Sequence, residues 1–222
     1  MNVGHGDWTF QREDIARDFD AHVREQLPWY DLATGAVAHI ARHYIPEGGL
    51  VYDVGASTGN IGRSLAETLV ARRARLVAIE SSPDMAHQYR GPGELVEADA
   101  LAFPFEEFDV AIVFLVLMFL PAGRRKGFLR DLCAKIRPGG VLIVFDKVTG
   151  PSGYLATVLH RLTIAGKVAT GAAPAEIIAK ELSLIGVQRP LGARFMELAV
   201  SPMPTEVFRF GEFVGWVIEN PE

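Results

Sequence analysis

Apolar and polar positions change periodicity several times along the central part of the chain. Between apolar runs, hydrophobic residues recur at helical spacing, as Ile61, Leu65 and Leu69 do. Strands that alternate with helices are typical of a parallel sheet covered on both faces. Five runs are rich in apolar residues and are predicted to be strands: 49–55, 74–82, 93–101, 108–117 and 141–148.

The segments on either side of this central part have different patterns. Residues 12–45 are amphipathic and are predicted to be helical, with an interruption near Pro28. Residues 153–171 and 173–186 are predicted to form two more helices, and residues 206–219 a terminal hairpin. The fold class is therefore α/β, with a doubly wound, mostly parallel seven-stranded sheet and helical additions at both ends. One domain spanning 1–222 is the simplest account, with a helical cap at 1–47, a core at 48–147 and a further part at 148–222.

Composition narrows the functional classes. The 222 residues are 49% apolar and 22% charged with a net charge of −5, so the totals do not indicate a basic groove for nucleic acid. The longest apolar run, 110–120, is shorter than the ~20 residues of a membrane-spanning helix. The N-terminus has no secretory pattern, and the only cysteine, Cys133, is interpreted as a buried helix residue. These features predict a cytoplasmic protein without a membrane segment, and the sequence has no CxxC or HExxH pattern for a metal.

The stretch VYDVGASTGN, residues 51–60, is the first candidate site. Asp53 ends a predicted strand, and Gly55 and Gly59 follow in a turn that leads into a helix. Gly55 is expected to adopt a positive φ, and Gly59 to let the backbone approach a ligand. The dinucleotide motif GxGxxG is absent because position 57 is Ser57. A carboxylate at this place suits a cationic ligand better than a pyrophosphate.

Two further acids follow the next two predicted strands. Glu80 ends the second strand, where a carboxylate can accept hydrogen bonds from both ribose hydroxyls, and Asp99 follows the third strand, at a position suited to an adenine amine. Ligands of doubly wound sheets bind at the carboxyl ends of the strands, so three successive acids there predict a nucleoside-binding site.

With these residues in view, the chain resembles the class I S-adenosylmethionine-dependent methyltransferases, which have a Rossmann-like fold. The matching segments are VYDVGASTG, the Glu80 strand end, Asp99 and IRPGGVLIVFD, together spanning about residues 48–147. The resemblance implies S-adenosylmethionine as cofactor. The residues expected to bind it are Tyr30, Asp53, Gly55, Ala56, Ser57, Gly59, Glu80, Ser81, Asp99, Ala100 and Phe114.

A narrower resemblance is to the carboxy-S-adenosylmethionine synthases, which use prephenate to carboxylate the cofactor's methyl group. It is seen in GDWTF (residues 6–10), LPWYDL, VYDVGASTGN and FLVLMFLPAGRR. In that family a tyrosine lies over the cofactor, which implies this role for Tyr30. Three positions depart from the family: Ala56 replaces a cysteine, Phe114 an asparagine, and Glu181 an arginine that a neighbouring subunit supplies for the cofactor's carboxylate. Lys180 or Arg189 could supply that cation instead.

Three functions remain open at this point: methyl transfer to an unidentified acceptor, synthesis of carboxy-S-adenosylmethionine, and cofactor binding without turnover. Methyl transfer needs little beyond alignment, so no catalytic residue is assigned. His160 and Arg161 are candidates for lining a small-molecule acceptor pocket. Four aromatic residues of the hairpin are predicted either to form a homodimer face or to pack in the core: Phe208, Phe210, Phe213 and Trp216.

Overall fold

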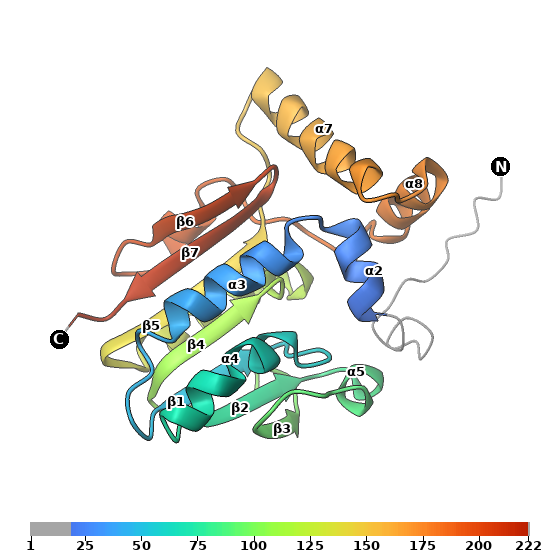
Figure 1. Ribbon diagram of the computed structural model, residues 1–222. Helices are drawn as coiled ribbons and strands as arrows, with labels where there is room; N and C mark the ends of the chain where they lie inside the picture. The colour runs from blue at the N-terminus through green and yellow to red at the C-terminus, as the bar shows by residue number, and fades with distance from the viewer. Residues whose placement is uncertain (1–18, 222) are drawn as a thin grey trace.

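The computed structural model describes residues 19–221, and within them the strands form one seven-stranded sheet (Figure 1). Its order is β3-β2-β1-β4-β5-β7-β6, and β1 to β5 are parallel whereas β7 runs antiparallel to both of its neighbours. The predicted doubly wound, mostly parallel seven-stranded sheet is confirmed. The strand bounds are β1 Leu50–Val54, β2 Arg75–Glu80, β3 Glu94–Glu97, β4 Phe108–Phe114, β5 Ile136–Lys147, β6 Thr205–Phe210 and β7 Phe213–Glu219.

Helices cover both faces of the sheet. On the face toward the viewer in Figure 1 lie α3 (Tyr30–Ala41) and α4 (Asn60–Ala71), with α2 (Phe19–Gln26) beside the start of α3. The other face is covered by α6 (Ala122–Cys133) and the short α9 (Phe195–Ala199). The helices α7 (Tyr154–Ala169) and α8 (Pro174–Ser183) extend beyond the end of the sheet, and α8 lies next to α2.

Burial on two faces explains why the central strands are so apolar. In β1 every residue is buried, and successive side chains enter opposite clusters. Val51 packs with Ile61 and Leu65 of α4, whereas Tyr52 packs toward Phe128 on the other side. Each cluster buries apolar surface, which stabilises the fold by about 25 cal/mol for each Å² removed from water. The sheet is therefore a rigid support for the loops that follow its strands.

The structure departs from the predicted elements in several places, and the strand predicted at 93–101 ends at Glu97. The predicted strand at 108–117 ends at Phe114, because Leu115 has a φ of 61° and the chain turns into a 3-10 helix, η1 (Leu117–Phe119). The strand β5 begins at Ile136 instead of residue 141, and the register shifts between Phe108 and Val110. The helix α9 was not predicted, since five residues are too few to show helical periodicity.

One short helix forms as its sequence predicts. The Ser82 hydroxyl accepts a hydrogen bond from the Met85 amide, and Pro83 occupies the first position of α5 (Pro83–His87). Among residues 19–221, no helix combines the length and the apolar character needed to cross a membrane.

Candidate functional site

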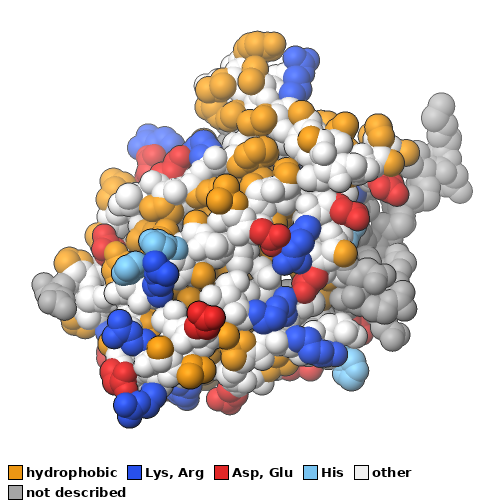
Figure 2. All heavy atoms as spheres, in the orientation of Figure 1, with side chains coloured by type: hydrophobic (Ala, Val, Ile, Leu, Met, Phe, Trp, Pro, Cys, Tyr) orange, Lys and Arg blue, Asp and Glu red, His pale blue; other side chains and the backbone are white. Residues whose placement is uncertain are grey.

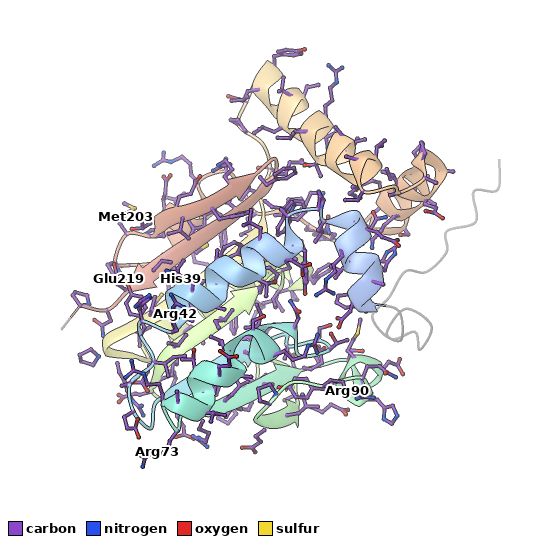
Figure 3. All side chains as sticks on the ribbon, viewed as in Figure 1. His39, Arg42, Arg73, Arg90, Met203 and Glu219 are labelled. Atoms are coloured by element: carbon purple, nitrogen blue, oxygen red, sulfur yellow. The ribbon has the colours of Figure 1, made fainter. Side chains whose placement is uncertain are left out.

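A cavity of about 280 Å³ lies where β1, β2 and β4 end. Its walls come from α2, the start of α3, the loops after these three strands, the end of β5, and α7 and α8. Figure 1 shows the carboxyl ends of β2 and β4 directed toward the side of the molecule where α5, α2 and α8 lie. His39, Arg42 and Glu219 lie at the opposite end of the sheet, where α3 and β7 end, and are therefore far from the cavity (Figure 3).

Asp53, at the end of β1, is the most unusual group in the cavity wall. Asp53 is 1% exposed, and its Oδ2 atom has no hydrogen-bond partner among residues 19–221. Burial raises the pKa of the carboxyl group to about 7, and the nearby Glu80 adds to the rise, while a hydrogen bond from the Gly62 backbone acts against it. A buried acceptor without a donor costs free energy in the ligand-free protein, so Asp53 is suited to a ligand that brings one.

The turn after Asp53 needs glycine at two positions, but for different reasons. Gly55 has a φ of 69°, as expected, and a Cβ there would lie 2.5 Å from Val116 Cγ2 of the loop after β4. Gly59 has a φ of 88°, and a Cβ there would lie 2.5 Å from the Gly91 backbone. Gly59 therefore makes room for the Gly91 backbone; it does not line the cavity, and its approach to a ligand stays a prediction.

Glu80, at the end of β2, lies in the same wall. Its Oε2 accepts a hydrogen bond from the Ser57 amide and its Oε1 one from the Ser82 amide, both at 2.8 Å. Burial raises the pKa of Glu80, although these backbone donors oppose the rise. The Ser81 backbone also acts on this carboxylate, and its remaining acceptor positions suit a ligand's hydroxyl groups. Ala56, Ser57 and Ser81 line the cavity beside it.

The third predicted acid lies elsewhere. Asp99 is exposed, its Oδ1 accepts a hydrogen bond from the Leu101 amide, and neither Asp99 nor Ala100 lines the cavity. The preceding strand β3 is at the edge of the sheet, so residues that follow it need not face the space above β1. The role of Asp99 and Ala100 in cofactor binding stays a prediction.

Two aromatic side chains of the cavity wall contact each other. Tyr30 opens α3 and is 6% exposed, and its ring meets Phe114 edge-on with centroids 5.6 Å apart. Arg24 of α2 lies over the Tyr30 ring at 5.6 Å. Burial raises the pKa of the Tyr30 hydroxyl, so the side chain is a neutral phenol.

Helix α2 is held over the cavity by polar contacts to the turn. Asp20 accepts hydrogen bonds from Thr58 and from Arg63, which lies on α4. Within residues 19–221, Gln26 Oε1 on α2 is the only buried side-chain nitrogen or oxygen atom besides Asp53 Oδ2 that lacks a partner. Both residues line the cavity. Gln26 was not predicted, because a glutamine inside an amphipathic helix shows no sign in the sequence that it will be buried.

The far end of the cavity contains a cluster of lysines. Lys147 ends β5, Lys167 lies on α7 and Lys180 on α8, and all three line the cavity. Glu181 also lines it, but its Oε1 is 2.7 Å from Lys167 Nζ. Burial opposes ionisation of Glu181, yet the Lys167 hydrogen bond and neighbouring positive charges leave its pKa below the usual value.

The structure separates the two cations proposed for this region. Lys180 lies at the cavity, whereas Arg189 is exposed and outside its wall. His160 and Arg161 are also exposed and outside the wall, and His160 Nδ1 is 3.1 Å from Glu212. Neither residue lines this cavity, so a role for His160 and Arg161 at an acceptor stays a prediction. Helix α7 faces the cavity with Lys167 and turns these two residues away from it.

Comparisons with known proteins agree with this geometry. Residues 51–140 match the model of a methyltransferase domain. The chain has the class I S-adenosylmethionine-dependent methyltransferase fold. It is 26% identical to the carboxy-S-adenosyl-L-methionine synthase of Staphylococcus epidermidis, over 97% of this chain and 98% of the relative. These findings confirm the fold that the broader resemblance implies.

Solved structures share the fold at low identity. DhpI in its complex with SAH has a TM-score of 0.61 and 14% identity, with 94% of this chain and 93% of that chain covered. An O-methyltransferase family protein from Burkholderia thailandensis has a TM-score of 0.65 and 13% identity, with 96% and 62% covered. At this identity the likeness concerns the fold.

Proposed function

We propose that the protein is an S-adenosylmethionine-dependent transferase that delivers a methyl group to a small-molecule acceptor. The observation that supports it best is the pair of carboxylates, Asp53 and Glu80, at the ends of two adjacent strands in one cavity wall. Asp53 Oδ2 has no partner within the described residues, as expected of an atom that meets a ligand donor. The methyltransferase domain match over residues 51–140 supports the same assignment.

The chemistry of the cavity wall fits this cofactor. Asp53 accepts hydrogen bonds from the ammonium group of the amino-acid tail, and Glu80 accepts them from the ribose hydroxyls. Phe114 and Tyr30 supply apolar surface, and residues of α2 form a further part of the wall. The bound cofactor supplies an activated methyl group on a sulfonium.

The protein's own part is then mainly alignment. An activated methyl group needs an acceptor atom held in line with it, and effective concentration accounts for much of the rate. Neutral acceptor atoms such as thioethers and amines need no base, whereas a hydroxyl must lose its proton. Because the acceptor atom is not identified, no catalytic residue is assigned among the acids Asp53 and Glu80 and the lysine cluster of the cavity wall.

Calorimetric titration with S-adenosylhomocysteine tests this proposal. We expect saturable 1:1 binding by the native protein, weaker binding by the Asp53→Asn variant, and unchanged binding by Asp131→Asn, which alters an exposed carboxylate on α6. Native mass spectrometry of the purified protein adds a direct readout, because a retained cofactor is identified by its mass. No binding at millimolar ligand would contradict the proposal.

The second candidate is the carboxy-S-adenosylmethionine synthase reaction. The relative from Staphylococcus epidermidis, similar along almost its whole length, has this name, and Tyr30 lies at the cavity. The GDWTF motif that also favours it lies outside the described residues. Incubation with S-adenosylmethionine and prephenate, followed by mass spectrometry, distinguishes the two: a carboxylated sulfonium favours the synthase, and unchanged cofactor excludes it.

Oligomeric state and location belong to the proposal as well. The hairpin aromatics named for a dimer face pack within the chain: Phe213 and Trp216 are buried, and Phe208 and Phe210 are partly buried against the core. Exposed apolar residues lie on α7 instead, among them Tyr154, which is 72% exposed (Figure 2). We retain a cytoplasmic homodimer as a prediction, and sedimentation at micromolar concentration tests the dimer.

A further inference from the structure

One buried polar atom in the cavity wall has no part in the function proposed above. Gln26, in the last turn of α2, is 4% exposed and lines the cavity, and its Oε1 has no hydrogen-bond partner among residues 19–221. The amide of Gln188 in the same wall differs, because its Oε1 accepts a hydrogen bond from Lys147 Nζ at 3.2 Å. An amide oxygen that is buried without a donor costs free energy in the ligand-free protein. Gln26 Oε1 is therefore suited to a ligand that brings a donor.

The two ends of α2 lie at different parts of the cavity. At the start of the helix, Asp20 accepts a hydrogen bond from Thr58 of the glycine turn. At its end, the Glu25 backbone oxygen accepts a hydrogen bond from the Thr170 hydroxyl, directly after α7, at 2.5 Å. Gln26 comes six residues after Asp20, which is about 9 Å further along a helix. Gln26 therefore lies toward α7, away from the glycine turn beside which the cofactor is proposed to bind.

The surroundings of Gln26 favour an uncharged ligand group. His22, one turn earlier on α2, lies with its Nε2 2.6 Å from Lys180 Nζ. Lys167 of α7 and Glu181 of α8 pair with each other at 2.7 Å. These ionisable groups have partners within the chain, whereas the neutral Gln26 oxygen has none among the described residues. A neutral hydroxyl or N–H group satisfies an amide oxygen without bringing a charge to a buried position, where an added charge is costly.

Apolar side chains line the cavity on both sides of Gln26 along the chain. Val23 of α2 and Leu27 directly after it line the cavity, and so do Leu184 after α8 and Phe213 at the start of β7. An apolar ligand surface fits such a wall, but a polar group on the ligand must find a partner when it leaves water. The ligand that suits this part of the cavity has an apolar body and an uncharged donor group.

We infer that Gln26 Oε1 accepts a hydrogen bond from a neutral hydroxyl or N–H group of the methyl acceptor, which is otherwise an apolar molecule. The inference rests on the proposed function, which places the cofactor at Asp53 and Glu80 and makes the ligand beside it an acceptor. An amide does not ionise, so Gln26 orients the donor group and does not remove its proton. Such orientation is what alignment with an activated methyl group requires.

Pairs of probes with similar shape test the inference, one member of each pair with a proton to donate and one without. The pairs are phenol with fluorobenzene and indole with benzofuran, titrated by NMR into the protein saturated with S-adenosylhomocysteine. We expect phenol or indole to bind about fivefold to tenfold more tightly than its counterpart, as one neutral hydrogen bond to a buried acceptor allows. The side-chain amide signal of Gln26 should move with the donor probe and not with its counterpart.

Two substitutions of Gln26 should give different results. Gln26→Met has nearly the same shape but a sulfur that accepts only weakly, so both members of a pair should bind equally. Gln26→Glu keeps an oxygen in place and should keep or increase the preference for the donor probe. A purely structural role predicts the reverse order, because methionine suits an apolar site and a buried carboxylate does not. Glu25→Met, at an exposed position of the same helix outside the cavity wall, should change nothing.

The outcomes separate this inference from the proposed function. Equal affinities within both pairs, or no measurable binding of any probe, overturn the inference, and the proposed function stands where S-adenosylhomocysteine binds. If Gln26→Met weakens S-adenosylhomocysteine binding about tenfold and leaves the pairs unchanged, the partner of Gln26 is the cofactor, and the inference is wrong. If S-adenosylhomocysteine does not bind but the donor probes show a preference that depends on Gln26, the proposed function fails and the binding role of Gln26 stands.

Discussion

Replacing Asp53 by asparagine should change stability and cofactor binding in opposite directions. The folded pKa of Asp53 is about 7, against an ordinary value of 3.8. The folded protein therefore binds this proton more readily than the unfolded chain does. The resulting contribution to stability is complete below pH 3.8 and is lost as the pH rises through 7. At pH 8 the buried carboxylate is ionised and destabilises the fold.

The magnitude follows from the two pKa values. The linkage relation gives a destabilisation on the order of 4 kcal/mol at pH 8 and about 2 kcal/mol at pH 5. Asparagine does not titrate, but its buried amide costs about 1–3 kcal/mol if it finds no partner. The net gain of the Asp53→Asn variant at one pH is therefore small or moderate. Its change between pH 5 and pH 8, about 2–3 kcal/mol, does not depend on that amide cost.

Urea unfolding of the native protein and the variant at both pH values measures this change. The variant should gain stability relative to the native protein as the pH rises, whereas Asp131→Asn should not. Calorimetry should then find S-adenosylhomocysteine binding weaker by one to two orders of magnitude, because a charge-assisted hydrogen bond of about 1.5–3 kcal/mol is lost. Equal stability differences at pH 5 and pH 8 would show that Asp53 is not the perturbed buried acid inferred from the structure.

Substitutions at three other residues test separate parts of the cavity. Gly55→Ala should lower the free energy of unfolding by about 2 kcal/mol or more, since it adds a Cβ 2.5 Å from Val116 at a φ of 69°. The control is Gly123→Ala on α6, where a Cβ meets open space, and equal effects of the two substitutions would refute the steric reason. Tyr30→Phe should retain S-adenosylhomocysteine affinity within about threefold, whereas Tyr30→Ala should lose about 3–5 kcal/mol of stability and most binding; calorimetry and thermal unfolding separate the two. Gln26→Leu should stabilise the ligand-free protein by about 1–3 kcal/mol in urea unfolding, because it removes an unpaired buried oxygen, and a loss of stability would mean that Oε1 has a partner.

Much of the fold and part of the site could be predicted because they depend on neighbours in sequence. Asp53 and Glu80 each end an apolar run, and parallel strands bring their carboxyl ends to one edge. The same rule does not locate Asp99. It predicts at which end of the sheet a residue lies, but not whether a residue that follows the edge strand β3 faces the cavity. Lys147 also ends an apolar run, so the rule applied to lysine would have found it.

Other site residues depend on how helices pack, which the sequence pattern does not specify. Gln26 is buried because Asp20 holds α2 against Thr58 and Arg63. Lys167 and Lys180 meet because α7 and α8 come together over the end of β5. Periodicity identified the helices but could not distinguish Lys167, which faces the cavity, from His160 and Arg161, which do not.

The charges of the cavity also explain how so many ionisable groups are tolerated in one wall. The wall contains three acids and three lysines, so their formal charges cancel; Asp53 and Glu80 lie at one end, and Glu181 lies with the lysines at the other. Two opposite charges about 10 Å apart attract by roughly 1–2 kcal/mol at an effective dielectric constant of 20. The attraction is too weak to neutralise the acids, so Asp53 and Glu80 still favour the cationic groups of the proposed cofactor.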